Sequence, residues 1–496
     1  MTRTNMVARN VLVSVANQLL TWVLSFWVTV MLPQHLGDVG FGQFCLAFAI
    51  AGLCGIVITL GTSTVLVREV ARDHGRVSDL LPAALAVRLP LTLAAIGIAL
   101  AASEILHYSR EVTLLIVIAE AATGLGTFND AFGSVLQGLE QLPKQNLPIF
   151  LERLIYSVGT IILLLMNQPI WTLIAISLLS NVCSLLINII LVRPYVGSVK
   201  LPTIRSMAEL LKEGLPFAAS SVFSSLYSQC DSPILEKLGA ISMVGWYNLG
   251  RRLIGAALFF PVALTSALLP TLARMSREDP DAFAPLVRRM INMVLIAVVP
   301  FAVLLLFGSR QILVILRYSP DFAGSVPVLA VFGAGFVAWY LSQVVGTSLI
   351  ASDKQKALSR ITGIAALISA PLCIALVTLW QSQWHNGAIG AAVSDVAVET
   401  FLLTCYLRAS SYSLMGVGSL WTVLKAVAAS LPLVLLLHAT GESHKTSLIV
   451  LYGAAGALAY LPLCLLFRCV QAEDMSMIRS ALARRRAGTA AFTAEP

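Results

Sequence analysis

The sequence predicts an all-α polytopic membrane protein with about fourteen transmembrane helices. Three observations predict this class. Hydrophobic residues make up 58% of the 496 residues, charged residues make up only 12%, and the mean hydropathy is +0.85. A soluble globular chain carries roughly a quarter of charged residues to cover its surface, so a chain with half of that charge must have lipid as its main solvent. The apolar residues also occur in long runs separated by short polar connections.

The apolar runs give the order of the predicted helices. A helix that crosses a bilayer needs about 20 mostly apolar residues. The first run is too long for the core of a signal peptide and no small-residue cleavage pattern follows it, so we expect it to be retained. Prolines inside several spans are compatible with this interpretation, because neighbouring helices can satisfy the freed backbone groups. The predicted spans are 10–32, 41–64, 80–101, 111–135, 149–166, 169–192, 215–235, 244–272, 290–308, 325–350, 361–380, 387–407, 421–439 and 447–467.

The positive charge of the chain is distributed unevenly between the connections. The sequence has 33 Lys and Arg against 25 Asp and Glu, a net charge of +8. About 23 of the 33 basic residues fall at the N-terminus, in the even-numbered connections and in the C-terminal tail, whereas about 5 fall in the odd-numbered connections. This is the positive-inside pattern, so we expect both termini in the cytoplasm. Because orientation accounts for the charge, no nucleic-acid partner is expected.

The chain resembles itself at an offset of roughly 200 residues. Segment 36–44 has Leu-Gly and then a glycine followed closely by an aromatic residue, and segment 238–247 has the same pattern. Any two membrane hairpins share some likeness, which is the alternative interpretation. Six helices separate the copies, so both would have the same orientation, as in transporters built from parallel repeats with a substrate path between them. The predicted domains are an N-lobe over 1–205, a C-lobe over 206–408, two further helices over 409–467 and a cytoplasmic tail over 468–496.

Two groups of motifs resemble the polysaccharide and O-antigen flippases of the multidrug/oligosaccharidyl-lipid/polysaccharide exporter superfamily. Each motif alone is loose, and their order and spacing along essentially the whole chain carry the resemblance. The first group is Leu36-Gly37, Gly40-Phe41-Gly42-Gln43-Phe44, Gly61-Thr62-Ser63 and Val67-Arg68-Glu69-Val70-Ala71-Arg72. The second is Gly214-Leu215-Pro216-Phe217, Tyr227, Asp231, Gly245-Trp246-Tyr247-Asn248-Leu249-Gly250-Arg251-Arg252-Leu253, Leu269-Pro270 and Ala273-Arg274.

The resemblance implies a flippase of the bacterial inner membrane. Such a protein moves an undecaprenyl-diphosphate-linked oligosaccharide repeat unit between leaflets by alternating access, for the synthesis of O-antigen, capsule or exopolysaccharide. The implied partners are this glycan lipid, membrane lipids, a coupling proton or sodium ion, and the polysaccharide polymerase machinery. No cofactor or metal is expected, because the eight cysteines form no C-x-x-C pair, the six histidines are distant from one another and the chain has no Walker A motif.

Charged residues at membrane depth are the main candidates for function, since each costs about 2.5–3.5 kcal/mol on insertion scales. Asp231 lies before one predicted turn, and Arg251 and Arg252 lie after it at a similar depth. The two arginines point about 100° apart on a helix. One is therefore predicted to pair with Asp231 while the other faces the cavity and binds the lipid diphosphate, whose oxygens match a guanidinium. The alternative is a structural ion pair beside a snorkelling arginine.

Further candidates lie on other predicted helices. Arg88 is level with the stretch between Glu120 and Asp130, which predicts either a structural ion pair or a role in the cavity. Asp395 and Glu399 are spaced i,i+4 and share one helix face, where a carboxylate could carry a coupling proton or make a satisfied polar contact.

A polar stripe on the first predicted helix completes the candidate site. It includes Asn17 and Gln18, which could line the cavity or form hydrogen bonds between helices. The candidate substrate-binding residues are thus Arg88, Arg251, Arg252, Asn17 and Gln18. The candidate ion-pair or coupling residues are Asp231, Glu120, Asp130, Asp395 and Glu399.

Three other functions compete with this interpretation. A lipid II flippase and a multidrug or cation antiporter belong to the same superfamily. A glycan polymerase or glycosyltransferase is the alternative from another class, but such an enzyme needs a sizeable extracytoplasmic loop with carboxylates. The longest such predicted connection, 309–324, has one carboxylate, Asp321, so enzymatic activity is not expected.

Overall fold

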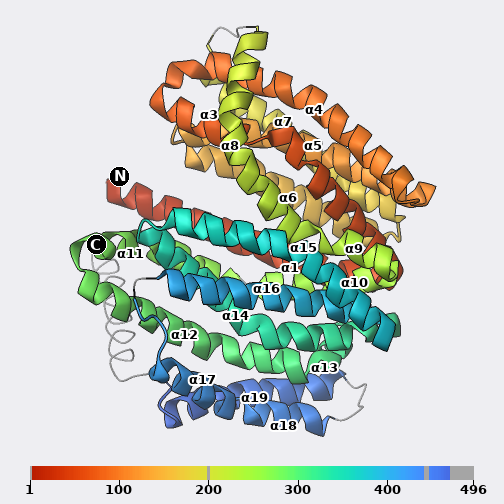
Figure 1. Ribbon diagram of the computed structural model, residues 1–496, viewed down its shortest axis with the longest axis vertical. Helices are drawn as coiled ribbons and strands as arrows, with labels where there is room; N and C mark the ends of the chain where they lie inside the picture. The colour runs from red at the N-terminus through yellow and green to blue at the C-terminus, as the bar shows by residue number, and fades with distance from the viewer. Residues whose placement is uncertain (1–2, 198–200, 258, 411, 441–445, 470–496) are drawn as a thin grey trace, which may run out of the picture. The chain divides into compact units, whose positions relative to one another are not determined.

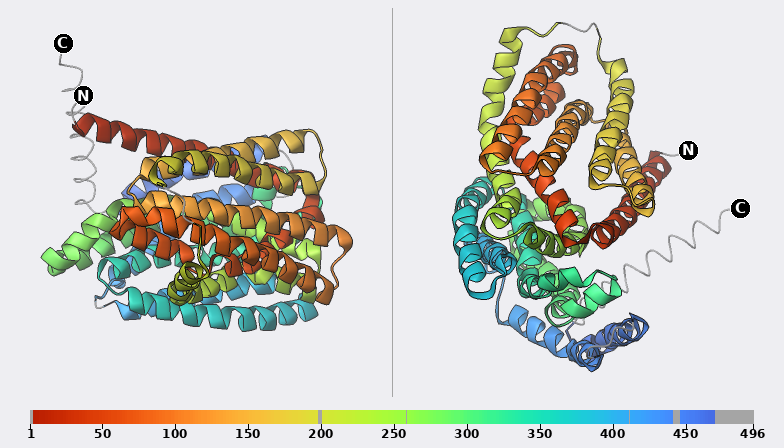
Figure 2. Two further views of the ribbon diagram at one scale, coloured as in Figure 1. Left: turned by 90° about the horizontal axis from the view of Figure 1, so that it is seen from above. Right: turned by 90° about the vertical axis from the view of Figure 1, so that its right-hand side faces the viewer.

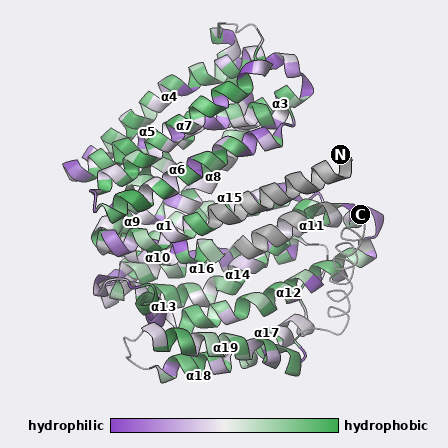
Figure 3. Ribbon diagram, turned by 180° about the vertical axis from the view of Figure 1, so that it is seen from behind, coloured by the Kyte–Doolittle hydropathy of each residue, from purple (hydrophilic) through white to green (hydrophobic). Residues whose placement is uncertain are grey.

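The computed structural model describes residues 3–197, 201–257, 259–410, 412–440 and 446–469, and every regular element in these ranges is a helix (Figure 1). Eleven helices within the described residues are long and apolar enough to cross a membrane. The predicted all-α membrane class is confirmed, whereas the count of fourteen spans stays a prediction. Figure 3 shows hydrophobic residues along the long helices and hydrophilic residues gathered towards helix ends and connections.

The chain forms two compact units. Unit 1 consists of Met1–Ala256, Arg317–Val328 and Thr362–Asp395, and unit 2 consists of Ala257–Leu316, Leu329–Ile361 and Val396–Pro496. All candidate residues except Glu399 fall in unit 1. The division into lobes at residue 205 stays a prediction, and the predicted tail lies outside the described residues from 470 onward.

The elements of unit 1 follow the sequence order closely. They are α1 (Arg3–Cys54), α2 (Ile56–Thr59), α3 (Thr62–Arg72), η1 (His74–Arg76), α4 (Val77–Ile105), α5 (Arg110–Gly138), α6 (Leu142–Leu165), α7 (Ile170–Val192), η2 (Arg193–Tyr195), α8 (Ile204–Gln229), α9 (Asp231–Leu238), most of α10 (Ile241–Ala257), η3 (Pro320–Gly324) and parts of α14 to α16. Helix α5 contacts α1, α3, α4 and α7, and α6 packs on α7. These helices run side by side, as the end-on view in Figure 2 shows.

Unit 2 is built around α12. Its elements are α11 (Phe259–Glu278), α12 (Pro280–Phe307), α13 (Ser309–Ile315), most of α14 (Ser325–Ala351), α17 (Val417–Ala429), α18 (Leu431–Ala439), α19 (Thr446–Leu466), and parts of α15 (Gln355–Trp384) and α16 (Gly387–Ala409). Helix α12 contacts α11, α17 and α18. The Tyr460 hydroxyl of α19 donates a hydrogen bond to the Ile296 carbonyl of α12.

A glycine accommodates the bend in α1. Gly37 has φ 66° and ψ −178° inside this helix, a conformation that glycine adopts without the steric penalty of a Cβ atom. The sequence predicted a break between residues 32 and 41, and the structure has a kink there rather than a loop. The kinked helix continues to Cys54.

Three predicted spans are interrupted within the described residues, and one of them, 421–439, is divided at Ser430 between α17 and α18. The prediction of one continuous helix over 41–64 is wrong, because Leu60 and Gly61 have left-handed φ angles of 39° and 74°. A Cβ atom on Gly61 would collide with the carbonyl oxygen of Gly214 in α8, so this break allows a close approach between distant segments. The predicted span 215–235 is likewise divided between α8 and α9, and Pro233 lies in the first turn of α9, where its missing N–H is tolerated.

Candidate functional site

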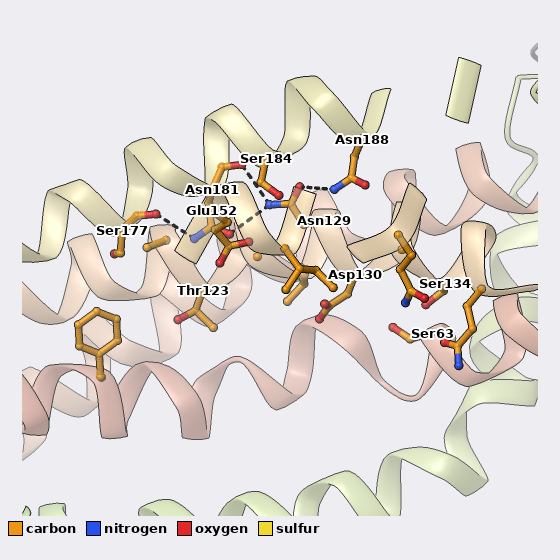
Figure 4. A pocket seen from close by; sticks show the side chains of 18 residues that line it. Ser63, Thr123, Asn129, Asp130, Ser134, Glu152, Ser177, Asn181, Ser184 and Asn188 are labelled. Carbon is orange, nitrogen blue, oxygen red and sulfur yellow. Dashed lines mark hydrogen bonds between the residues drawn. The ribbon is translucent and has the colours of Figure 1, made fainter. Parts of the chain in front are cut away.

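Unit 1 contains a cavity of about 520 Å³ whose wall comes from five helices, α1, α3, α5, α6 and α7 (Figure 4). Most of the wall consists of hydroxyl, carboxamide and carboxylate groups. The polar lining residues are Ser63, Thr123, Thr127, Asn129, Asp130, Ser134, Gln137, Gln145, Glu152, Ser177, Asn181, Ser184 and Asn188. Phe48, Ala122, Ile149 and two glycines complete it. A polar cavity of this size among apolar helices is a candidate ligand site.

Three asparagines hold one side of the cavity in place. Asn129 Nδ2 of α5 donates hydrogen bonds to the Asn181 backbone oxygen at 3.0 Å and to Asn181 Oδ1 at 3.1 Å. Asn188 Nδ2 donates to Asn129 Oδ1 at 3.0 Å. Asn181 Nδ2 donates to the Ser177 carbonyl at 2.9 Å. Figure 4 shows this chain of bonds joining α5 to α7, and it orients the carboxamides before any ligand binds.

Arg88 of α4 stabilises the same cavity wall without lining the cavity itself. Its side chain is fully buried in α4, and it donates hydrogen bonds to Ser63 Oγ at 2.8 Å and to the Thr127 carbonyl. Asp130 lies within electrostatic range of the guanidinium. Arg88 therefore orients two residues that line the cavity while its own side chain contributes nothing to the lining.

Glu120 lies in α5 and is fully buried. Among the described residues, neither of its carboxylate oxygens has a hydrogen-bond partner. The described structure contains no ion pair between Arg88 and either Glu120 or Asp130. Of the two expected partners of Arg88, only Asp130 interacts with its charge.

A second polar cluster joins α9, α10 and α16. Arg251 Nη1 lies 3.1 Å from Asp231 Oδ2, and Arg251 Nε lies 4.0 Å from Asp395 Oδ2. The Tyr247 hydroxyl lies 2.7 Å from Asp231 Oδ2 and 2.7 Å from Asp395 Oδ2. Asp231, Tyr247 and Asp395 are buried. Of the two adjacent arginines, Arg251 is the one that pairs with Asp231.

Arg252 points to a different environment. Its guanidinium carbon lies 5.1 Å from the ring centroid of Phe41 and 5.4 Å from that of Phe44, both in α1. Tyr156 and Tyr318 also lie within electrostatic range of its charge. In the described part of the chain, carboxylates lie within ion-pair distance of Arg251 but not of Arg252. Contacts with aromatic faces stabilise a cation without neutralising it.

Three predicted residues remain, Asn17, Gln18 and Glu399. Asn17 and Gln18 belong to α1, but their side chains lie outside the described part of the structure. Glu399 is buried one turn beyond Asp395 in α16 and belongs to unit 2.

Sequence reasoning missed several residues of both clusters. Tyr247 and the three asparagines of the cavity were not candidates. Asn181 and Asn188 are seven residues apart in one apolar span, a spacing that places both on one helix face. That spacing could have identified Asn181 and Asn188 as candidates from the sequence.

Comparison with protein families and solved structures agrees with this fold. A family model described as polysaccharide biosynthesis protein matches residues 7–276, and the MatE family model matches residues 216–375. No curated protein matches the chain.

Two solved structures resemble the chain along most of its length. The lipid II flippase MurJ in an inward closed conformation is 16% identical, with 92% of this chain and 99% of that chain covered and a TM-score of 0.71. An inward-facing multidrug resistance MATE family transporter of the MOP superfamily is 14% identical, with 78% of this chain and 93% of that chain covered and a TM-score of 0.61. The first is described as a flippase and the second as a transporter. Because the first family model spans more than half of the chain, this multi-pass membrane protein belongs to the polysaccharide biosynthesis protein family.

Proposed function

We propose that this protein moves an undecaprenyl-diphosphate-linked oligosaccharide repeat unit across the bacterial inner membrane by alternating access, for the synthesis of a cell-surface polysaccharide. The family model is described as polysaccharide biosynthesis protein, and the fold is shared with a lipid II flippase. The observation that carries the proposal is the position of Arg252. The bias of basic residues supports an orientation with both termini in the cytoplasm.

Arg252 is the proposed ligand of the lipid diphosphate. A phosphate group needs a cation whose charge is not already neutralised and whose N–H groups are accessible. Arg251 fails the first condition because Asp231 and Asp395 surround it. Arg252 is partly exposed and its guanidinium packs on the rings of Phe41 and Phe44. Neither ring neutralises its charge, and the N–H donors of a guanidinium match phosphate oxygens.

The cluster around Tyr247 is the proposed coupling site. The Tyr247 hydroxyl lies 2.7 Å from one carboxylate oxygen of Asp231 and 2.7 Å from one of Asp395. A hydroxyl donates a single hydrogen, so the second short contact needs a proton on one of the two carboxyl groups. With that proton the buried cluster of Arg251 and two carboxyls has no net charge, which a low-dielectric site favours.

A proton suits this cluster better than a sodium ion, because the Arg251 guanidinium already occupies the place of a cation between the carboxyl groups. Within the described residues, the titratable side chains of Tyr227, Cys230 and Cys373 also lie within electrostatic range of this cluster.

The transport proposal is tested by deleting the gene in its host and analysing lipid-linked glycans on each face of the inner membrane. We expect one undecaprenyl-diphosphate-linked oligosaccharide to accumulate in the cytoplasmic leaflet and the matching surface polysaccharide to disappear. Reintroduction of the wild-type chain restores both, and reintroduction of Arg252→Ala does not. A deletion strain without any accumulated lipid-linked glycan would contradict the proposal.

The fold likeness to MurJ favours a lipid II flippase as the second candidate. The same deletion strain distinguishes the two. Accumulation of lipid II with loss of cell-wall synthesis would identify the second candidate, whereas an intact cell wall with loss of one surface polysaccharide supports the first.

A further inference from the structure

We infer that the cavity between α1, α3, α5, α6 and α7 is a carbohydrate-binding pocket that receives an uncharged sugar ring of the transported glycan. This inference rests on the proposed function, since it assigns the sugar part of the same substrate. Arg252 lies outside the lining of this cavity, so the sugar pocket and the proposed diphosphate ligand are separate groups of residues.

The composition of the wall excludes two parts of a glycan lipid as occupants. Thirteen of the 18 lining residues carry a hydroxyl, carboxamide or carboxylate group. A lipid chain in this cavity would leave those groups without hydrogen bonds, which is costly in a medium of low polarity. No lysine or arginine belongs to the lining, and two carboxylates do, so a phosphate in the cavity would meet two negative charges and no cation in the wall.

The hydrogen-bonding pattern matches a polyol. A sugar hydroxyl both donates and accepts, as do hydroxyl and carboxamide side chains, and a carboxylate accepts from two neighbouring hydroxyls. The chain through Asn129, Asn181 and Asn188 fixes part of the wall. In the described residues, the side chains of Gln137 and Gln145 make no hydrogen bond within the protein and face the same cavity. The wall thus combines a preorganised part with groups available to a ligand.

The two carboxylates of the pocket can also serve a sugar ligand. Asp130 lies within electrostatic range of Arg88, and Glu152 lies within range of Arg153. Glu152 also lies within range of Asp130, whose negative charge acts on it more strongly than the positive charge of Arg153. Each carboxylate can accept hydrogen bonds from sugar hydroxyls, and displacement by a cation distinguishes a neutral ligand from a cationic one.

Size and shape fit the same occupant. The volume of about 520 Å³ lies within the range of roughly 300–1,000 Å³ typical of small-ligand pockets. Phe48 provides an aromatic surface in an otherwise polar wall, and a pyranose ring has an apolar C–H face that can pack on it. Figure 4 shows the polar side chains of α5, α6 and α7 directed toward one another across the cavity.

The test uses the purified full-length protein in lipid nanodiscs. Saturation-transfer NMR measures binding of a panel of methyl glycosides of neutral hexoses and N-acetylhexosamines, with tetraethylammonium as the cationic probe and inorganic phosphate as the anionic probe. We expect a signal from at least one glycoside and no displacement of it by either ion. Thr123→Trp should fill the cavity, and Asn181→Leu should remove a carboxamide from its wall, each lowering the glycoside signal at least fivefold.

Matched controls separate the pocket from general effects on the protein. Leu114→Trp adds the same indole to an exposed position of α5, and Asn292→Leu makes the same polar-to-apolar change in unit 2. Both should keep the wild-type signal. Loss of signal in Thr123→Trp supports the pocket only if this variant and Leu114→Trp unfold at the same temperature. If Thr123→Trp does not fold, Asn181→Leu provides the second variant.

The outcomes distinguish this inference from the proposed function. Absence of binding by every glycoside, or displacement of a glycoside by tetraethylammonium, overturns the sugar pocket even if the deletion strain accumulates a lipid-linked glycan. Glycoside binding that survives in Arg252→Ala and is lost in Thr123→Trp supports the pocket, even if the deletion strain accumulates nothing and the transport proposal fails.

Discussion

Gly42 of α1 and Gly245 of α10 pack into the same helix crossing, each against the backbone of the other helix. A Cβ atom on Gly42 would collide with the Ile241 carbonyl oxygen, and one on Gly245 would collide with the Asp38 carbonyl oxygen. The two glycines occupy matching positions in the two segments of the predicted repeat. Their close approach brings Phe41 and Phe44 against the helix that carries Arg252, because small residues let helix backbones approach closely.

Substitution at this crossing should separate the two helices. Gly245→Val places a branched side chain where the Asp38 backbone already lies, so we expect a loss of about 1–3 kcal/mol of stability from overpacking, measured by thermal unfolding in detergent. Gly97→Ala is the control, because nothing lies within 4 Å of a Cβ atom at Gly97. A Gly245→Val variant as stable as Gly97→Ala would show that the crossing can relax without cost.

Removal of the Arg252 guanidinium should weaken binding of the diphosphate. Hydrogen bonds to charged groups contribute about 1.5–3 kcal/mol, so Arg252→Ala should bind undecaprenyl diphosphate about 10- to 100-fold more weakly than the wild type. Arg252→Lys should recover part of the affinity, since it keeps the charge but loses the fork of donors. Lys356→Ala removes an exposed cation and serves as the control. Wild-type affinity in Arg252→Ala would refute the assignment.

The Tyr247 hydroxyl should be required for the response of transport to pH. Tyr247→Phe removes the group that joins Asp231 to Asp395, so the two carboxyl groups can no longer share a proton through it. We expect transport in proteoliposomes to lose its dependence on an imposed pH gradient. Stability should fall by about 1–3 kcal/mol, because the buried partners become unsatisfied. Tyr452→Phe, in α19 of unit 2, is the matched control. If Tyr247→Phe responds to the gradient as the wild type does, the proton resides elsewhere.

Glu69 should give the protein an acid-sensitive contact outside the membrane spans. Burial alone would raise the pKa of Glu69, but its hydrogen bond with Arg68 and the charges of Arg76, Arg68 and Arg72 outweigh burial and lower it. Glu69 Oε1 lies 2.9 Å from Arg68 Nε and 3.0 Å from Arg72 Nη1. A carboxyl group with a lowered pKa in the folded state adds stability above its unfolded pKa, about 4.3, and this stability disappears as the pH falls through the folded value.

The measurement for Glu69 is thermal unfolding between about pH 3 and pH 6. We expect Glu69→Gln to be less stable than the wild type at pH 6 and to lose less stability on acidification. Glu278→Gln, at an exposed position, should follow the wild type. Parallel acid profiles for Glu69→Gln and the wild type would contradict the contribution of this ion-pair cluster.

The sequence predicted the helices well where the signal was local. Run length and hydropathy depend only on neighbouring residues, which is why the all-α membrane class is confirmed by the structure. The prediction over 41–64 was wrong because the break at Leu60 and Gly61 accompanies a contact with Gly214. No window of sequence around residue 61 contains that partner.

The residues of the candidate site were likewise predicted only in part. The sequence identified Asp231, Arg251 and Arg252 because a charge in an apolar run is conspicuous and costly. It left open which arginine pairs with the carboxylate, and it did not find Tyr247 or the asparagines of the cavity. Hydroxyl and carboxamide groups are tolerated in membrane helices for many reasons, so their presence alone indicates no site.

The sequence by itself determined that this chain is a bundle of membrane helices, which helices carry charge at depth, and which family its motifs resemble. The tertiary structure alone decided that Arg251 pairs with Asp231 and Asp395 while Arg252 rests on Phe41 and Phe44. It also decided that polar residues from α5, α6 and α7 surround one cavity. The physical reason is the separation in sequence of the residues involved. Helix formation and hydropathy depend on adjacent residues, whereas the partner of a side chain depends on how distant helices pack.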